Sequence, residues 1–290
     1  MNKSKIRNPK SALQMTFAKK SFGQNFLVDQ NYIDKIVAAL NPQKDETIIE
    51  IGAGRGAMTE KLINSGASVI AIELDRDLIP FLREKFGKYE NFRLIELDAL
   101  KVDFAELLNN PKSDFPNPKV AKLVANLPYY ISTAILQKLI RQREIFSEMI
   151  LMFQREVVDR ITAKPGNSER GFLTVLVEAY LNTEKLFDVP PSAFQPSPKV
   201  QSTVVRLITK EMCEIEKNDE YLFRELLSMS FAQKRKTILN NLKNVPPGLK
   251  EKIGDVENLL ENCGIDPKRR AETLTLNEWI NLIEKHPDCD

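Results

Sequence analysis

Five consecutive residues, Asn126-Leu-Pro-Tyr-Tyr130, combine an amide, a stiff turn and two aromatic rings. The exocyclic amine of adenine is a poor nucleophile, because its lone pair is delocalised into the ring. The Asn126 amide oxygen and the Leu127 carbonyl could accept its two N–H bonds and aim that lone pair at a methyl donor. Pro128 stiffens the turn without adding a donor, and Tyr129 offers a stacking face for a flipped base. The alternative is an ordinary proline turn with core tyrosines.

Such chemistry suits a chain that is poor in other catalytic groups. His286 is the only histidine, which argues against a His base, a Ser-His pair or a His-rich metal site. No strong base is needed, since the proton becomes acidic once the methyl group is added. Catalysis would then depend on positioning and electrostatics. The cysteines at 213, 263 and 289 have neither zinc nor disulfide spacing, so we expect no metal and a reduced, cytoplasmic location.

A glycine-rich segment, Glu50-Ile-Gly-Ala-Gly-Arg-Gly56, follows a predicted strand and precedes a predicted helix. Glycines there allow close approach to a ligand, and the helix N-terminus offers free N–H groups. Gly52, Gly54 and Ala57 satisfy a dinucleotide-binding pattern. Glu73 follows about 20 residues later, where a carboxylate can accept both ribose hydroxyls. These residues leave NAD and S-adenosylmethionine open, and a structural turn is the alternative.

The elements that position these residues alternate between strand and helix. Hydrophobic periodicity predicts strands at 47–51, 69–72, 92–97, 123–125 and 149–153, and helices at 33–40, 58–63, 78–86 and 131–140. This alternation predicts a parallel sheet with helices on both faces, in which ligands bind beyond the carboxyl ends of the strands. Glu73, Asp98 and Asn126 all stand at such ends, so we expect them to share one site. Asp98 could meet the amine of a bound adenine, or could simply cap a helix or form a turn.

The rest of the chain suggests three parts. We predict a basic arm over 1–18, an α/β domain over 19–210 and a small all-helical domain over 211–290. In that last domain, hydrophobic periodicity predicts helices at 221–231, 237–242, 256–260 and 276–283. Residues 1–28 contain no acidic side chain, which is typical of a polyanion contact or of a solvated tail. Residues 190–200 carry four prolines and cannot form a helix or a central strand. We expect this loop to hold Phe194 out of the core, although a buried anchor is the alternative.

Composition limits the classes of protein that the sequence fits. A formal net charge of +2 does not by itself indicate a nucleic-acid binder. No apolar run approaches the roughly 20 residues needed to span a bilayer, and the N-terminus lacks the apolar core of a signal peptide. We therefore expect no membrane partner.

Several motifs, in this order and spacing, are similar to those of the ribosomal RNA adenine N6,N6-dimethyltransferases, and the resemblance runs from about Lys20 to Leu242. The matching segments are Ser21–Leu27, Glu50–Gly56, Ala71–Glu73, Leu97–Ala99, Asn126–Thr133, Phe194 with Pro196–Val200, and Phe231–Thr237. Within that family the chain resembles the small-subunit type. The resemblance implies a Rossmann-like class I methyltransferase sheet, followed by a small all-helical C-terminal domain that binds RNA.

The resemblance also implies a cofactor, S-adenosyl-L-methionine, and the residues that hold it. Asn25 and Leu27 would close over the cofactor. Gly52 would hold its methionine end, Glu73 its ribose and Asp98 its adenine.

For the substrate, the resemblance implies that Asn126 bridges the cofactor and the target amine. Phe194 would stack on the target base opposite Tyr129. A basic cluster recurs in the family, and we expect it to open a helix and to contact RNA phosphates: Lys234, Arg235 and Lys236. A second cluster, Lys268–Arg270, is equally typical of a solvated surface.

The function implied is dimethylation of N6 of two adjacent adenines near the 3′ end of small-subunit (16S) rRNA, in ribosome biogenesis, by a monomer that acts on the small ribosomal subunit. The nearest alternative is an Erm-type 23S rRNA adenine N6-methyltransferase, which shares the catalytic set and confers macrolide resistance. Tyr130 and residues 231–237 favour the small-subunit type. An NAD-dependent oxidoreductase remains an alternative only if the glycine loop is considered alone. A non-enzymatic assembly factor or transcription partner is also open, but the presence of Glu73, Asn126 and Tyr129 argues against lost activity.

Overall fold

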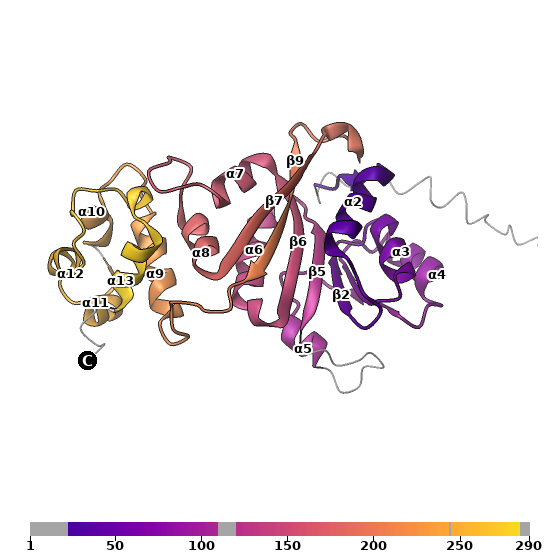
Figure 1. Cartoon of the computed structure of the whole chain (residues 1–290), viewed down its shortest axis with the longest axis horizontal. Helices are drawn as coiled ribbons and strands as arrows, with labels where there is room; N and C mark the ends of the chain where they lie inside the picture. Colours follow the sequence, from indigo (N-terminus) through magenta and orange to yellow (C-terminus); the bar gives the residue numbers. More distant parts are fainter. Residues whose placement is uncertain (1–22, 110–119, 244, 285–290) are drawn as a thin grey trace, which may run out of the picture. The chain divides into compact units, whose positions relative to one another are not determined.

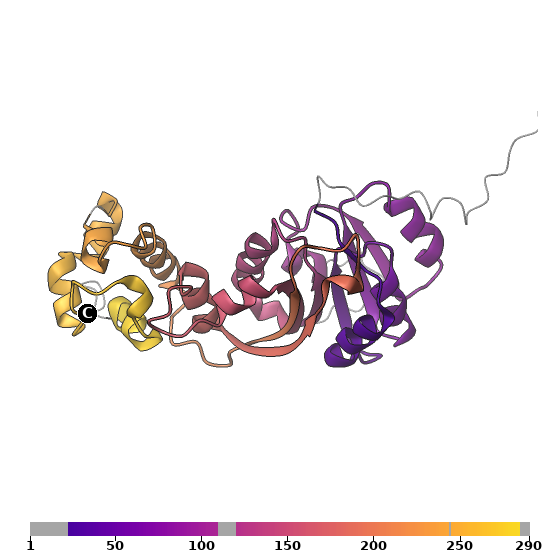
Figure 2. The same cartoon turned by 90° about the horizontal axis from the view of Figure 1, so that it is seen from above.

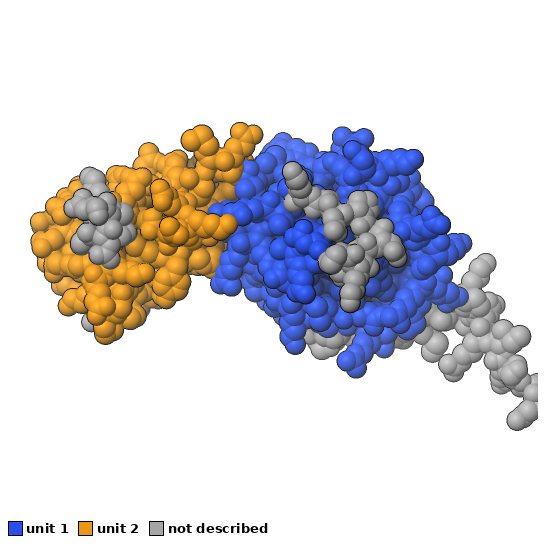
Figure 3. Space-filling model, turned by 90° about the horizontal axis from the view of Figure 1, so that it is seen from below, with its two compact units in different colours: residues 1–155, 184–209 blue, residues 156–183, 210–290 orange. Residues whose placement is uncertain are grey.

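The computed structural model describes residues 23–109, 120–243 and 245–284, so the predicted basic arm lies outside the described residues. The chain divides into two compact units, coloured separately in Figure 3. Unit 1 comprises the residues up to 155 and 184–209, and unit 2 comprises 156–183 and the residues from 210 onward. The second domain predicted from the sequence starts at residue 211, whereas unit 2 also takes in residues 156–183.

Unit 1 is built on a seven-stranded sheet with the order β4-β3-β2-β5-β6-β9-β7 (Figures 1 and 2). The strands are β2 (Thr47–Ile51), β3 (Ser68–Glu73), β4 (Phe92–Glu96), β5 (Ala121–Asn126), β6 (Phe146–Gln154), β7 (Leu181–Val189) and β9 (Ser202–Thr209). Strands β2 to β6 run parallel, and β9 is antiparallel to β6. This mostly parallel sheet confirms the predicted Rossmann-like α/β fold.

Helices flank the sheet and bury its interior strand β2. They are α2 (Gln30–Leu40), α3 (Ala57–Asn64), α4 (Ile79–Phe86), α5 (Phe104–Leu108), α6 (Ser132–Arg141) and the short η2 (Arg143–Ile145). All five residues of β2 are buried, as expected for a parallel strand covered on both faces. The apolar run at 47–51 therefore lacks the alternation of a half-exposed strand.

A short two-stranded ribbon joins the N-terminal segment to the proline-rich loop. Strand β1 (Phe26–Leu27) pairs antiparallel with β8 (Phe194–Gln195), which follows the one-turn helix η3 (Pro191–Ala193). The backbone N–H groups of Val28 and Asp29 both donate to the Ala193 carbonyl, at 2.9 and 3.2 Å. The segment over 23–29, which we call the lid segment, is thus fixed to residues far away in the sequence.

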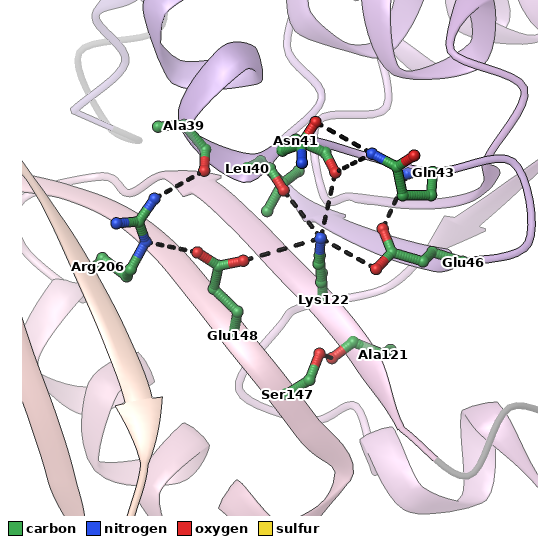
Figure 4. A network of polar contacts seen from close by, with 10 residues as sticks. All are labelled: Ala39, Leu40, Asn41, Gln43, Glu46, Ala121, Lys122, Ser147, Glu148 and Arg206. Atoms are coloured by element: carbon green, nitrogen blue, oxygen red, sulfur yellow. Dashed lines mark hydrogen bonds and ion pairs between the residues drawn. The ribbon is translucent and has the colours of Figure 1, made fainter.

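Helix α2, which follows the lid segment, is held at both ends. At its start, the Asp29 side chain accepts from the Asn31 N–H (2.9 Å). At its end, cationic side chains from β5 and β9 donate to the last carbonyls of the helix (Figure 4): Lys122 to Leu40 and Asn41, and Arg206 to Ala39. Positive charge is favourable at a helix C-terminus.

Glu148 on β6 joins the two cations beneath that helix end (Figure 4). One carboxylate oxygen lies 2.6 Å from Arg206 Nε and the other 3.9 Å from Lys122 Nζ. The side chains of Glu148, Arg206 and Lys122 are largely buried, with 16%, 26% and 14% of their surface exposed, respectively. The network therefore ties the helix behind the lid segment to three adjacent strands.

Unit 2 consists mainly of helices: α7 (Arg155–Ile161), α8 (Phe172–Tyr180), α9 (Glu220–Ser230), α10 (Ile238–Leu242), α11 (Pro247–Ile253), α12 (Val256–Asn262), the short η4 (Ala271–Thr273) and α13 (Leu276–Glu284). Four of them match the helices predicted at 221–231, 237–242, 256–260 and 276–283 within two residues. Trp279 anchors the core of the unit and lies 5.7 Å from Phe231, centroid to centroid. Within the described ranges, no helix is long and apolar enough to cross a membrane.

We expect Glu148→Ala to lower the free energy of unfolding by about 2 kcal/mol, because it removes the partner that Arg206 and Lys122 share and leaves them only their separate ion pairs with Glu184 (2.6 Å) and Glu46 (3.0 Å). Urea denaturation followed by circular dichroism measures the change. The matched control is Glu60→Ala, which removes the exposed ion pair with Lys85 (2.6 Å) and should cost less than about 1 kcal/mol. Equal losses in the two variants would show that the Glu148 network does not anchor the helix.

Candidate active site

A cavity lies beyond the carboxyl ends of β2, β3 and β5, where the sequence predicted the polar residues to meet. The predicted site residues that line it are Asn25, Gly52, Glu73, Asp98, Asn126, Leu127, Pro128 and Tyr129. Leu27 instead lines a neighbouring cavity, which shares Phe26, Gly52, Gly54 and Asn126 with the first. The structure thus gathers most of the predicted site at one edge of the sheet.

The glycine loop between β2 and α3 forms the floor of this cavity. Gly52 has φ +79°, a left-handed conformation that suits glycine, and faces the Asn126 carbonyl across the site. Gly56 is constrained further, because a Cβ there would lie 2.4 Å from the Phe86 ring. The backbone of the glycine loop therefore faces the cavity without side chains in between. A ligand can approach such a backbone closely.

Glu73, at the end of β3, organises the loops around the cavity. Its Oε2 accepts from the Gly54 N–H (2.9 Å), and its Oε1 accepts from the N–H groups of Leu74 (2.9 Å) and Asp75 (2.8 Å). Burial raises the pKa of this carboxyl, and the three backbone donors oppose that rise. A carboxylate has about four acceptor positions, so Glu73 keeps capacity for a ligand hydroxyl.

Asp98 and two exposed leucines form another side of the cavity. Asp98 Oδ1 accepts from the Leu100 N–H (2.9 Å), so this residue does form the turn considered as the alternative role. Its other carboxylate oxygen has no hydrogen-bond partner among the described residues. Leu74 and Leu97 line the same cavity at 43% and 39% exposure, which offers apolar contact to a flat ring beside a hydrogen-bond acceptor.

Asn126, at the end of β5, has its amide orientation fixed by the lid segment. Its Nδ2 donates to the Asn25 carbonyl (3.1 Å), while its Oδ1 has no hydrogen-bond partner among the described residues. The oxygen is therefore the acceptor left for a ligand.

Tyr129 is fixed in a different way. Its hydroxyl lies 2.8 Å from Ser202 Oγ on β9. Burial raises the pKa of this hydroxyl, and the hydrogen bond partly offsets the rise. The group is therefore neutral near pH 7, and the ring is positioned to contact a ligand rather than to remove a proton.

Sequence reasoning missed the contacts that hold the lid segment over the cavity. Gln24 Nε2 donates to Asp75 Oδ2 (2.9 Å), and the Arg55 guanidinium lies 4.7 Å from the centre of the Phe26 ring. Asp75 is buried and lies two residues after Glu73. A second acidic residue so close to the end of a strand was the signal in the sequence that could have identified Asp75 as part of the site. The pairing of Gln24 with Asp75 has no such signal, because it depends on tertiary structure.

The expectation that the proline-rich loop holds Phe194 out of the core is wrong. Its side chain is 5% exposed and belongs to the main hydrophobic cluster together with Val189 and Ala193. Pairing of β8 with β1 places Phe194 opposite Leu27 and fixes the backbone there. Stacking of Phe194 on a target base stays a prediction, and it requires the ring to become accessible.

The predicted RNA-contacting cluster lies in unit 2. Lys234, Arg235 and Lys236 are exposed in the turn before α10 rather than inside that helix, whose N-cap is Thr237. In the second cluster Arg269 is committed to an ion pair with Glu278 and to the Thr273 carbonyl. This arginine therefore stabilises the fold of unit 2, and the first cluster is the better candidate for a nucleic-acid contact.

Glu50, at the end of β2, is the most deeply buried acid beside the site. It is 1% exposed, its Oε2 accepts from Thr59 Oγ1 (2.6 Å), and its Oε1 has no hydrogen-bond partner in the part of the chain that the structure describes. Burial is the main cause that raises its pKa from 4.5 to about 7, with a further contribution from the nearby Glu73. In the described part of the chain, no group of three or more His, Cys, Asp or Glu side chains could hold a metal ion.

The sequence of the chain is similar to those of known proteins along most of its length. Residues 15–282 match the family described as ribosomal RNA adenine dimethylase. The chain is 42% identical over 264 residues to the ribosomal RNA small subunit methyltransferase A of Geobacillus thermodenitrificans, which covers 91% of this chain and 89% of that protein.

Among solved structures, a dimethyladenosine transferase from Plasmodium falciparum has a TM-score of 0.69 and 31% identity, covering 89% of this chain and 95% of that chain. The 23S rRNA methyltransferase ErmE has a TM-score of 0.64 and 23% identity, covering 90% of this chain and 98% of that chain. At that identity the second likeness shows the fold alone.

The raised pKa of Glu50 predicts a specific pH dependence of stability. The folded state favours the neutral acid, so this stabilisation is complete below about pH 4.5 and is lost as the pH rises through about 7. Relative to Glu50→Gln, which stays neutral, the wild-type protein should lose up to about 3 kcal/mol across that window. Urea titrations of both proteins between pH 5 and 8 measure the difference, and parallel curves would contradict the prediction.

Proposed function

Since this chain belongs to the ribosomal RNA adenine dimethylase family and is an rRNA adenine dimethyltransferase, we propose that it dimethylates N6 of two adjacent adenines near the 3′ end of small-subunit (16S) rRNA. The observation that carries the proposal is the free amide oxygen of Asn126, which shares one cavity with Glu73 and Asp98. We further propose that the enzyme acts as a cytoplasmic monomer on the small ribosomal subunit, in ribosome biogenesis.

S-adenosylmethionine, the cofactor that we propose, supplies an electrophilic methyl group, and the cavity suits its parts. Gly52 would take the methionine end, where the loop backbone is bare. Glu73 would accept from the ribose with its remaining acceptor capacity, and Asp98 would bind the adenine amine. Leu74 and Leu97 would contact the faces or edges of that adenine. Asn25 would close over the cofactor from the lid segment, with Leu27 behind it.

The target adenine would be held by groups that need no change of protonation. In the first transfer Asn126 Oδ1 and the Leu127 carbonyl would accept the two N–H bonds of the amine, and in the second transfer one of them would accept the single N–H that remains, which favours a tetrahedral nitrogen with its lone pair aimed at the methyl group. Each transfer would form an N–CH3 bond as the S–CH3 bond of the cofactor breaks, and the nitrogen would then release one proton to solvent. Pro128 adds no donor that would compete for these acceptors. Tyr129, fixed by Ser202, stacks on the base. The rate enhancement then comes from positioning and from acceptors placed where positive charge develops on nitrogen.

RNA outside the active site would be bound mainly through its phosphates. The exposed cluster Lys234, Arg235 and Lys236 in unit 2 supplies adjacent positive charges. Such contacts position the RNA without reading its sequence. They should make binding weaken with rising salt.

The function is tested by incubating the protein with labelled S-adenosylmethionine and two substrates, undermethylated small subunits and protein-free large-subunit RNA. We expect dimethyladenosine only in the small-subunit rRNA, near its 3′ end. Label in the large-subunit RNA instead would move the assignment to an Erm-type enzyme. No label in either substrate would overturn the proposal.

Asn126 variants test the positioning role of the amide. We expect Asn126→Ala to lower kcat by about 10²- to 10³-fold, because a placed acceptor is lost. Asn126→Asp keeps an oxygen acceptor but loses the donor to the Asn25 carbonyl, so it should retain more kcat while binding the cofactor more weakly. Single-turnover methyl transfer and calorimetric titration of cofactor measure the two effects. Near-normal kcat in Asn126→Ala would refute the role.

A further inference from the structure

Tyr130 is an exposed aromatic ring at the cavity that the proposed chemistry leaves without a role. Its side chain is 58% exposed, although it lines the same cavity as Asn126 and Tyr129. No hydrogen bond or ring contact of Tyr130 is recorded within the described residues. Large aromatic side chains usually gain stability from burial, so a ring displayed at the site suggests a ligand.

The ring is nevertheless supported from one side. Gly23 in the lid segment has φ +54°, and a Cβ there would lie 3.3 Å from Cδ1 of Tyr130. The backbone of the lid segment therefore passes close to the edge of the ring. One part of the ring is held in place, while more than half of the side chain stays open to solvent.

Tyr129 and Tyr130 occupy different positions although they are adjacent in the chain. Tyr129 is half-buried and held by Ser202, whereas Tyr130 is exposed and has no such tether. The first ring is suited to a base that has entered the cavity. The second ring is suited to a base that remains outside.

A base flipped into the cavity leaves its neighbour one phosphodiester away, at the mouth. A neighbouring base that has lost its stacking partner exposes a π-face, and aromatic side chains bind such faces in single-stranded RNA. In the proposed substrate that neighbour is an adenine, because the two target adenines are adjacent. A purine offers a large surface for stacking on a tyrosine.

We propose that Tyr130 forms a second base-binding site, which takes the unpaired purine next to the target adenine while the target occupies the cavity. The inference rests on the proposed function. While one adenine occupies the cavity, the adjacent adenine is held at the mouth. Tyr130 thus binds substrate without touching the reacting nitrogen.

Steady-state kinetics with undermethylated small subunits tests the site. Stacking on an aromatic side chain predicts that Tyr130→Ala lowers kcat/KM by about 5- to 150-fold. We expect the change mainly in KM, because the contact is the same in the ground and transition states. Tyr130→Phe keeps the ring and should act like wild type. Tyr130→Leu keeps apolar volume without an aromatic face and should resemble Tyr130→Ala.

Two further measurements separate stacking from a role in supporting the lid segment. The dissociation constant for S-adenosylmethionine should stay within about twofold of wild type in Tyr130→Leu, since apolar contact with Gly23 is kept. Mass spectrometry of the rRNA fragment should show more molecules with only one adenine dimethylated. The matched control is Tyr89→Ala, which removes an exposed tyrosine (39%) absent from the cavity lining and should leave KM unchanged.

A Tyr130→Leu variant with wild-type KM would overturn the base-binding site. So would a rise in KM that Tyr130→Phe fails to rescue. Failure of the proposed function looks different, because wild-type protein itself would then leave both adenines of the small subunit unmethylated.

Discussion

The site depends on one buried carboxylate that joins three segments of chain. Glu73 accepts from the backbone of the glycine loop and from the two residues that follow its own strand. One of those residues, Asp75, in turn accepts from Gln24 of the lid segment. The loop, the strand end and the lid segment are therefore connected through a single side chain. Burial of this charge is unfavourable, and its backbone donors offset much of the cost.

At the reacting end of the cavity, a single side chain again has two roles. The lid segment uses the Asn126 amide nitrogen as a donor, so the amide oxygen alone is left to bind a target amine. The hydrogen bond that holds the lid segment beside the cavity therefore also orients the acceptor. This arrangement suits chemistry that needs no base, because correct placement of neutral acceptors supplies the catalysis.

The sequence predicted the site better than it predicted the contacts that close it. The strand-end rule located Gly52, Glu73, Asp98 and Asn126, because a parallel sheet brings the ends of its strands to one edge. Strands β1 and β8 have two residues each and carry no periodicity, so nothing in the sequence favoured the buried alternative for Phe194. Helix α8 was also missed, because seven of its nine residues are buried and no polar face marks it.

In the proposed function, Glu73, Asp98 and Asn126 meet only an adenine and a methyl donor, which would be identical whether the target adenine lies in small- or large-subunit RNA. Selection between rRNAs must then come from other residues. The likeness to ErmE extends over 98% of that chain, so the fold is not the difference either. Discrimination therefore falls to residues that meet the RNA around the target. Tyr130 at the mouth and the basic cluster before α10 are exposed and uncommitted to the core, which is what such contacts require. Phosphate contacts by lysine and arginine position RNA without reading it, so the base contact that we propose for Tyr130 is the better source of a preference for adjacent adenines.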